Sequence, residues 1–417
     1  MKISVSWAAC GAMMLLLSVS GCANIERFIN PVSQKKPASQ TTNQQAYAHD
    51  SGPASGQPYS AAPVIVPHMP PAPVPPSLTS AKVAILLPLS GANAGLGQAM
   101  LNAAQQAVFD AAGTNFQLLP HDTAAAGGAE AAARAAASEG AQLIIGPLFA
   151  TDVPAVLAVA QGSGISVLTL STDAALTQRG VYVMGLAPGP QVARVVAYAA
   201  AHGARRFAAL VPNTPYGSLV GGAFQTAVAQ NGGTVVDYET FDATAASLTS
   251  HAKAIAGQRA TIDALFLPEA GANLKSIADQ LAAAGMDSHV HLLGTGLWDV
   301  PDLGTQSALL NGGWYAAPDP AARQTFIANY SSAYGQQPPR LATLAYDATA
   351  LAAVLAKRGS RYDEVSLTNP NGFAGLDGIF RLTASGTVER GLAVDEVTPE
   401  GARVVDPAPV SFVGNAR

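Results

Sequence analysis

The sequence predicts an α/β protein built from two doubly wound parallel sheets. Short apolar runs alternate with helical patterns of about 10–15 residues from Ala81 onward, which is typical of consecutive βαβ units. The same alternation restarts near Gln191, so a second unit of this kind follows the first. From Gly378 to Val405 the pattern changes to closely spaced strands. We therefore expect two α/β lobes and a small antiparallel hairpin near the end.

The first lobe begins with a strand that is buried on both faces. Residues 83–88 are continuously apolar and end at Ser90-Gly91, as expected for a parallel strand covered by helices on both sides. A helix pattern follows from about Gly97 to Ala111. The other elements predicted here are a strand at 116–120, an Ala-rich helix at 128–139, a strand at 143–146, a helix at about 152–161 and a strand at 165–170.

The second lobe repeats this order. The predicted helices cover 191–202, 217–231, 247–257 and 272–285, and the strands cover 207–211, 233–236, 264–267 and 291–294. Two further helices are predicted at about 320–334 and 341–357. The strands expected in the tail are residues 378–382, a run from Val388 to Val397, and residues 403–405.

The first 21 residues have the pattern of a lipoprotein signal peptide. Lys2 precedes an apolar run that is too short to span a membrane, and Val19-Ser20-Gly21-Cys22 follows it. We expect the Cys22 thiol to take a diacylglycerol, the peptide before it to be cleaved and the new amine to be acylated. These acyl chains would hold the protein on a membrane. The alternative is an ordinary secretory signal with a chance cysteine. Ala23 after the cysteine favours, in a Gram-negative envelope, the periplasmic side of the outer membrane, with the inner membrane as the other candidate location.

Residues 22–80 are expected to form a disordered tether. This segment is rich in Gln, Ser, Ala and Pro and offers too little apolar surface to offset the entropy of ordering it. The expected organisation is therefore a signal peptide at 1–21, a tether at 22–80 and a folded part at 81–410.

Composition and motifs argue against several classes of function. Charged residues make up 12% of the chain, the net charge is −5 and no basic stripe is present, so we expect no nucleic-acid partner. The sequence has no serine-nucleophile elbow, Walker loop or zinc-protease motif, so we predict no enzyme activity, no catalytic residue and no cofactor. The seven histidines form no recognisable ligand set, and we predict no metal site.

Several stretches resemble a known family. Residues 83–91, the helix beginning near Gly97 and Asp122-Thr123 are similar to type I periplasmic binding proteins, the relatives of the leucine/isoleucine/valine receptors. Within this superfamily, four stretches resemble the penicillin-binding protein activator lipoproteins: residues 145–149, 212–217, 293–298 and 371–378. The resemblance covers about residues 81–410.

The resemblance implies a type I periplasmic-binding-protein fold, in which the chain crosses between two lobes three times. It places the crossings near Ala187, Pro318 and Leu367. The first lobe would then comprise residues 81–187 and 318–366, and the second residues 188–317 and 367–410.

In open α/β sheets, ligands bind at the carboxyl ends of the strands, near helix N-termini that favour anions. In the amino-acid receptors that this chain resembles, the matching loops bind the ligand carboxylate. The candidate residues of the first lobe are Ser90, Phe149, Ala150, Thr151, Ser171 and Thr172. Alternatively, the hydroxyl side chains only cap helices. Asp173 would repel a carboxylate, which argues against a simple amino-acid receptor.

The second lobe offers aromatic and acidic candidates. Tyr216 could close over a ligand, Glu269 could pair with an ammonium group, and Trp298 and Trp314 could line the same cleft. The alternatives are a turn for Tyr216, solvated surface for Glu269 and core packing for the tryptophans. We expect packing for Trp314 and a structural role for Asp347.

Two functions follow from the resemblance. The first is a non-catalytic lipoprotein, anchored to the membrane through Cys22, that binds and stimulates a class A penicillin-binding protein, a peptidoglycan synthase. The second is an ABC-transporter solute-binding protein for an amino acid or a similar small solute, held in the cleft. The tether and the expected sorting to the outer membrane favour the first, because a permease lies in the inner membrane.

Overall fold

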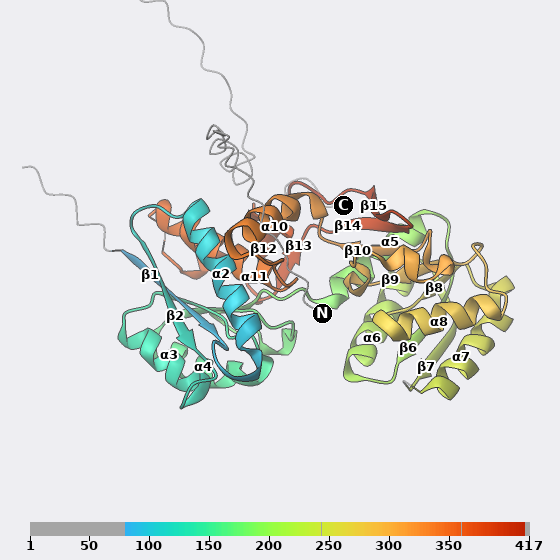
Figure 1. Cartoon of the computed structure of the whole chain (residues 1–417), viewed down its shortest axis with the longest axis horizontal. Coiled ribbons are helices and arrows are strands. Elements are labelled where there is room, and N and C mark those ends of the chain that lie inside the picture. Colours follow the sequence, from blue (N-terminus) through green and yellow to red (C-terminus); the bar gives the residue numbers. More distant parts are fainter. Residues whose placement is uncertain (1–79, 243, 360, 413–417) are drawn as a thin grey trace, which may run out of the picture. The chain divides into compact units, whose positions relative to one another are not determined.

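The computed structural model describes residues 80–242, 244–359 and 361–412 (Figure 1). The predicted signal peptide, Cys22 and the predicted tether up to residue 79 lie outside these described residues. The described part contains two separate, mainly parallel sheets and one small antiparallel sheet. We call the parts of the chain built around the two mainly parallel sheets the first and the second lobe.

The first lobe contains a five-stranded sheet of order β2-β1-β3-β4-β5 whose strands are all parallel. This order confirms the predicted doubly wound sheet. Its strands are β1 (Ala81–Leu87), β2 (Phe116–Asp122), β3 (Leu143–Ile145), β4 (Ser166–Thr169) and β5 (Val181–Val183).

Helices cover both faces of this sheet, as the continuous apolar pattern of β1 predicts. Val83, Ile85 and Leu87 pack toward a core that includes side chains of α2 and α11. Ala84 and Leu86 point to the opposite core, against α3 and α4. The helices are α2 (Ala94–Ala111), α3 (Gly128–Ser138), α4 (Val153–Ser163), α10 (Pro320–Tyr334), α11 (Ala342–Lys357) and α12 (Glu364–Leu367), with the short helices η1 (Gly91–Asn93), η2 (Ala150–Asp152) and η3 (Ala174–Leu176).

The second lobe contains a seven-stranded sheet of order β15-β14-β10-β9-β8-β6-β7. The strands β6 (Arg206–Pro212), β7 (Thr234–Phe241), β8 (Ala264–Phe266), β9 (His291–Gly294) and β10 (Trp314–Ala317) are parallel, whereas β14 (Ala393–Thr398) and β15 (Gly401–Asp406) add an antiparallel edge.

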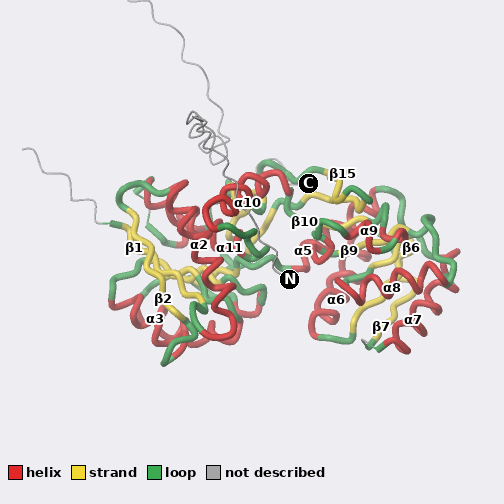
Figure 2. The backbone as a smooth tube through the Cα atoms, in the orientation of Figure 1, coloured by secondary structure: helices red, strands yellow, loops and turns green. Residues whose placement is uncertain are grey.

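Two cores again lie on the two faces of this sheet. Helices α5 (Pro188–Ala201) and α6 (Pro215–Gln230) contribute to one core, and α7 (Ala245–Gly257) and α8 (Gly271–Ala283) to the other (Figure 2). Shorter helices complete the lobe: η4 (Arg259–Thr261), η5 (Gly296–Trp298), α9 (Leu303–Gln306) and η6 (Ala308–Leu310).

The end of the chain differs from the prediction. The expected single strand from Val388 to Val397 is two strands, β13 (Val388–Arg390) and β14, which belong to different sheets. β13 joins β11 (Phe373–Gly375) and β12 (Gly378–Leu382) in a small antiparallel sheet. The predicted lone hairpin is therefore two antiparallel units.

This difference moves the third crossing between the lobes. Phe373, Phe380 and Leu382 of the small sheet are buried in the core of the first lobe, together with side chains of β1 and α11. These large apolar side chains keep residues 373–390 in the first lobe, so the chain crosses after Arg390 and not near Leu367. The other two crossings lie between β5 and α5 and between β10 and α10.

Candidate functional site

The hydroxyl of Ser90 is already bonded within the first lobe. It follows β1 and hydrogen-bonds the carboxylate of Asp122, which ends β2. The same carboxylate accepts from the backbone N–H groups of Leu89 at 2.8 Å and Ala124 at 2.9 Å. Burial opposes ionisation, but these hydrogen bonds prevail and lower the pKa of Asp122. Asp122 therefore positions the loop that carries Ser90.

The loop after β3 carries a hydroxyl group, that of Thr151, without a hydrogen-bond partner among the described residues. Phe149 packs against the core of the first lobe, and Ala150 beside it is half-buried. Thr151 is exposed, and its hydroxyl makes no hydrogen bond to any described residue. Thr151 lies inside η2, which leads into α4, and it is not the cap residue of either helix. The capping alternative therefore does not account for Thr151.

The loop after β4 contains one bonded and one open hydroxyl. Ser171 is buried, and its hydroxyl oxygen accepts from the backbone N–H of Asp173 at 3.1 Å. Asp173 in turn caps η3, because its carboxylate accepts from the N–H of Ala175 at 3.0 Å. Thr172 is exposed, and its hydroxyl has no partner among the described residues. Ser171 and Asp173 therefore shape the loop, whereas Thr172 presents a free hydroxyl.

The second lobe brings Tyr216, Glu269 and Thr295 close together. Tyr216 lies in the first turn of α6, and its hydroxyl is 3.0 Å from the Oγ1 atom of Thr295, which follows β9. Glu269 follows β8, and its Oε1 atom accepts from the N–H of Ala270 at 3.0 Å. Burial and the nearby Glu269 carboxylate raise the pKa of Tyr216, so this hydroxyl stays protonated at neutral pH.

The structure places both tryptophans in the packing of the second lobe. Trp298 has no exposed surface and lies in the core beside Tyr315, with ring centroids 6.4 Å apart. It therefore has no surface that a ligand could touch in this conformation, which corrects its assignment as a cleft residue. Trp314 is also buried and stacks on His291, with ring centroids 4.2 Å apart.

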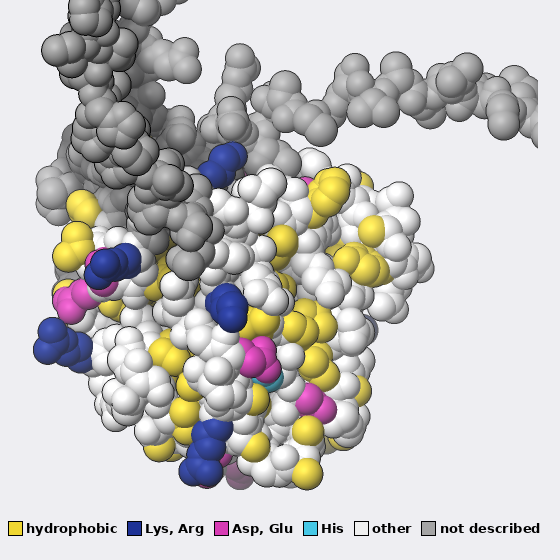
Figure 3. All heavy atoms as spheres, turned by 90° about the vertical axis from the view of Figure 1, so that its left-hand side faces the viewer, with side chains coloured by type: hydrophobic (Ala, Val, Ile, Leu, Met, Phe, Trp, Pro, Cys, Tyr) yellow, Lys and Arg dark blue, Asp and Glu magenta, His cyan; other side chains and the backbone are white. Residues whose placement is uncertain are grey.

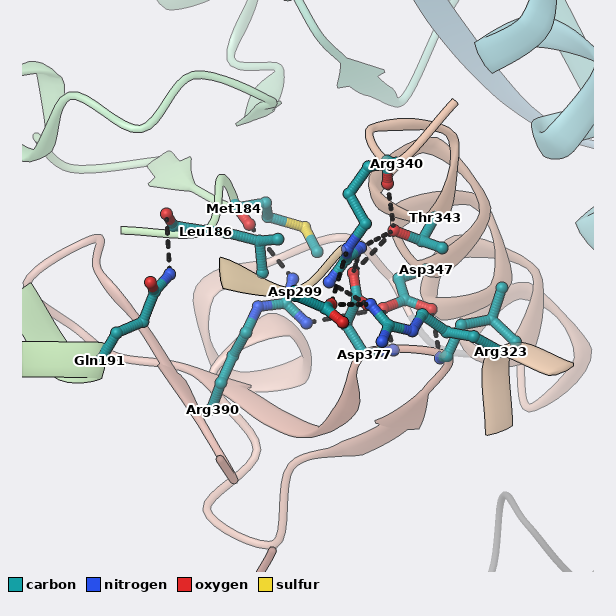
Figure 4. A network of polar contacts seen from close by, with 11 residues as sticks. Met184, Leu186, Gln191, Asp299, Arg323, Arg340, Thr343, Asp347, Asp377 and Arg390 are labelled. Atoms are coloured by element: carbon teal, nitrogen blue, oxygen red, sulfur yellow. Dashed lines mark hydrogen bonds and ion pairs between the residues drawn. The ribbon is translucent and has the colours of Figure 1, made fainter. Parts of the chain in front are cut away.

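A polar network lies where the chain crosses between the lobes (Figure 4). Of its residues, the sequence predicted a structural role only for Asp347. Asp347 of α11 accepts from the N–H of Leu376 at 2.7 Å and lies 3.5 Å from the guanidinium of Arg390. Arg390 also donates to the carbonyl of Met184 at 3.1 Å. One arginine at the third crossing thus contacts the start of the first crossing. No sequence motif marks Arg390, because its partners come from distant segments.

Two buried carboxylates of α11 and the small sheet share this network. Asp377 lies 2.9 Å from Arg340 and accepts from the hydroxyl of Thr343 at 2.7 Å. Burial opposes its ionisation, but Arg340 and Arg390 lower the pKa of Asp377. Burial and the neighbouring Asp377 carboxylate raise the pKa of Asp347 instead. The two carboxylates therefore differ in their tendency to hold a proton.

Among residues 80–242, 244–359 and 361–412, no three His, Cys, Asp or Glu side chains lie together as a metal site would require. Within the same ranges, no helix combines the length and apolar character needed to cross a bilayer. Figure 3 shows one face, on whose visible part the Lys and Arg side chains are few and scattered.

Solved structures of low sequence identity share this fold. One is a protein of Rhodospirillum rubrum provisionally assigned as a branched-chain amino acid ABC transporter, with 19% identity and a TM-score of 0.71 over 78% of this chain and all of that chain. The substrate-binding protein LivJ of Streptococcus pneumoniae, solved with isoleucine, has 20% identity and a TM-score of 0.56 over 79% of this chain and all of that chain.

A solute-binding protein of an ABC transporter from R. palustris, solved with benzoate, has 20% identity and a TM-score of 0.55 over 79% of this chain and 97% of that chain. At these identities the likeness shows the fold alone. Among curated proteins, the uncharacterized protein RP748 of Rickettsia prowazekii (strain Madrid E) is 22% identical over 227 residues. That match spans 52% of this chain and about three fifths, 61%, of the relative.

The family is shown by a match that covers most of the chain. Residues 80–380 match the sequence model described as periplasmic binding protein. This range includes the whole five-stranded sheet, all five parallel strands of the second lobe, and the loops that carry Thr151, Thr172 and Tyr216. The chain therefore belongs to the periplasmic binding protein family.

Proposed function

We propose that this chain is a non-catalytic receptor that binds a small amino-acid-like solute at the carboxyl ends of its two parallel sheets. The observation that carries the proposal is the pair of threonine hydroxyls without a hydrogen-bond partner among the described residues, Thr151 and Thr172, which lie after the neighbouring strands β3 and β4. Hydroxyl groups near the N-terminus of a helix, here α4, suit a carboxylate. The Asp173 carboxylate beside Thr172 accepts from the N–H of Ala175 in its own loop, which reduces the repulsion expected from the sequence. The similar proteins solved with isoleucine and benzoate both hold a carboxylate ligand, which supports this class of solute.

The second lobe supplies groups for the other end of such a solute. Glu269 uses one carboxylate oxygen for its own loop and leaves the other for an ammonium group. Tyr216 is held by Thr295 and adds a protonated hydroxyl beside Glu269. A carboxylate on the first lobe and an ammonium on the second would join the two lobes through one molecule, which favours an amino acid over a simple acid.

The test is solute binding by the purified full chain. Thermal unfolding with a panel of amino acids and aromatic acids identifies a solute, and calorimetry then measures its Kd. We expect the double variant T151A/T172A to weaken binding at least about 10-fold, because one charge-assisted hydrogen bond contributes about 1.5–3 kcal/mol. T249A, an exposed threonine on α7, is the matched control and should leave Kd unchanged.

Glu269 gives a second test of the same proposal. E269Q should weaken amino acids and leave acids without an amine unaffected, because only the ammonium needs the carboxylate. Failure of every panel member to raise the unfolding temperature would contradict the receptor proposal.

A second candidate is the activator of a class A penicillin-binding protein. The observation that favours it is that three predicted ligand side chains are occupied within the protein: Ser90 by Asp122, Ser171 by Asp173, and Trp298 by the core. The lipobox, the tether and the four activator-like stretches support it from the sequence. In this proposal the protein is anchored through Cys22, on the periplasmic side of the outer membrane.

Cross-linking in intact cells separates the two candidates. The lipidated protein is purified from membranes after cross-linking, and its partners are identified by mass spectrometry. Recovery of a class A penicillin-binding protein supports the activator, and recovery of ABC permease subunits supports the receptor. C22S should abolish the acyl mass on the protein and release it from the membrane fraction if the anchor is as proposed.

A further inference from the structure

Asp299 forms ion pairs that join the two lobes. It follows η5 in the second lobe, and its Oδ2 atom accepts from Arg323 Nη1 at 2.7 Å (Figure 4). The same oxygen lies 3.6 Å from Arg340 Nε. Both arginines belong to the first lobe, one on α10 and the other just before α11. The side chains of Asp299 and Arg323 are 19% and 9% exposed, so water screens the pair only weakly.

The first lobe holds both arginines in place. Arg340 pairs with the buried Asp377 at 2.9 Å and donates to the hydroxyl of Thr343 at 2.8 Å. Arg323 lies on the first turn of α10, and Phe326 and Tyr330 of the same helix pack in a core with α2. Arg340 therefore cannot follow Asp299 without disturbing first-lobe contacts, and the helix that carries Arg323 is fixed to the first lobe.

The second lobe holds the loop that carries Asp299 in place. The preceding residue, Trp298, is fully buried in the core of that lobe. Two residues before Trp298, the N–H of Gly296 donates to Gln191 Oε1 at 2.7 Å. Thr295, at the start of the loop, contacts the hydroxyl of Tyr216. One short loop therefore connects a candidate ligand side chain to the ion pairs between the lobes.

From these contacts we propose that Asp299 is a latch between the lobes. Its ion pairs with Arg323 and Arg340 hold the lobe orientation seen in this structure, and any change of orientation that moves the loop after β9 away from α10 must break them. Breaking them leaves a nearly buried guanidinium without its closest carboxylate, which disfavours the rearranged state. The latch sets the population of lobe orientations whatever solute or partner the protein binds.

Distances between spin labels on the two lobes test the latch without any ligand. The full chain, with Cys10 and Cys22 replaced by serine, receives labels at S138C on α3 and S250C on α7, two exposed serines. We expect D299N to shift or broaden the measured distance distribution relative to the parent. D302N is the matched control, because Asp302 lies in the same loop and is exposed, with no ion pair to any described residue.

The possible outcomes are distinct. A changed distribution in D299N with an unchanged one in D302N supports the latch. A D299N distribution that superposes on the parent's overturns it, and so does an equal change in both variants. If circular dichroism shows that D299N does not fold, R323Q decides, because Arg323 makes the shorter of the two ion pairs with Asp299 and no ion pair with another described residue. It should shift the distribution in the same direction, and an unchanged distribution in a folded R323Q overturns the proposal.

Discussion

At the scale of single residues, Asp395 shows how burial alters an acid. This β14 side chain is 1% exposed, and its Oδ1 atom has no hydrogen-bond partner among the described residues. Burial, with Asp299 and Asp319 nearby, raises its pKa to about 7 although Arg323 opposes this. Between about pH 4 and 7, Asp395 of the folded protein therefore holds a proton that the same residue of the unfolded chain, with a pKa of about 3.9, has lost. Its contribution to stability is favourable at low pH and declines as the pH rises from about 4 to 7.

D395N should remove this pH dependence. The amide cannot ionise, so the variant should be more stable than the parent at pH 8, by about 2–4 kcal/mol at roughly 1.4 kcal/mol per pKa unit. Near pH 4 the two should have similar free energies of unfolding. Urea unfolding at both pH values measures the difference. E400Q, on the exposed turn after β14, is the control and should follow the parent. A constant difference between D395N and the parent across this range would contradict the shifted pKa.

The sequence predicts which residues lie at the ends of the strands better than it predicts what these residues do there. Ser90, Thr151 and Thr172 lie at the carboxyl edge, as their positions after apolar runs indicated. Whether a hydroxyl is open or bonded depends on partners such as Asp122, which lies 32 residues from Ser90. Trp298 follows a strand, as a ligand residue would, yet its side chain is buried in the core. The sequence could not predict this, because the space that accepts the ring is formed only by the tertiary structure.

At the scale of elements, helices begin in close contact with the strands before them. α6 approaches the end of β6 so closely that a Cβ atom on Gly217 would lie 1.8 Å from the carbonyl oxygen of Pro212. α2 repeats this arrangement, with 2.0 Å between a Cβ on Gly97 and the oxygen of Pro88. These contacts allow the first helical turn to pack directly on the strand end where the candidate site lies.

Two glycines of the same helix should therefore respond oppositely to alanine. G217A forces backbone atoms apart and should lower the free energy of unfolding by more than about 1–3 kcal/mol, the cost of ordinary overpacking. G222A meets nothing within 4 Å and should stabilise α6 by about 0.5–1 kcal/mol, because alanine favours helix. Urea unfolding of both variants measures this contrast, and equal effects would contradict the close approach.

Long helices and the strands within the regular strand–helix alternation were predicted well, and three short strands outside this alternation were not. The helix at 320–334 and the strand at 291–294 have the predicted bounds. β5, β10 and β11 are three or four residues long and were not predicted. β3 and β8 are equally short but were predicted, because each lies between two helical patterns. The break between β13 and β14 was missed because the sequence of this segment carries no information about which sheet each half joins.

At the scale of the whole molecule, Arg390 links segments that are far apart in sequence. Its side chain is 5% exposed, pairs with Asp347, donates to the Met184 carbonyl and lies over the ring of Phe380 at 5.0 Å. These contacts connect α11, the first crossing and the small sheet. The loss of this one guanidinium leaves the buried Asp347 without its cation.

R390Q should cost about 3–5 kcal/mol of unfolding free energy, the usual effect of breaking a buried ion pair. R381Q is the matched control, because Arg381 lies in the same small sheet but pairs with Glu389 on the surface. Its loss should cost less than about 1 kcal/mol. Chemical unfolding of both variants gives the comparison, and similar losses would contradict the structural role of Arg390.

The late return of the chain to the first lobe has a consequence for biosynthesis. Strands β1 to β5 are complete at Val183, but their core also needs α11 and the Phe373–Leu382 segment, which is made about 190 residues later. At 5–20 residues per second, the nascent first sheet waits roughly 10–40 s for these partners, with apolar surface uncovered. Chaperones that hold nascent chains should therefore bind this half longer than the second, whose five parallel strands are synthesised together.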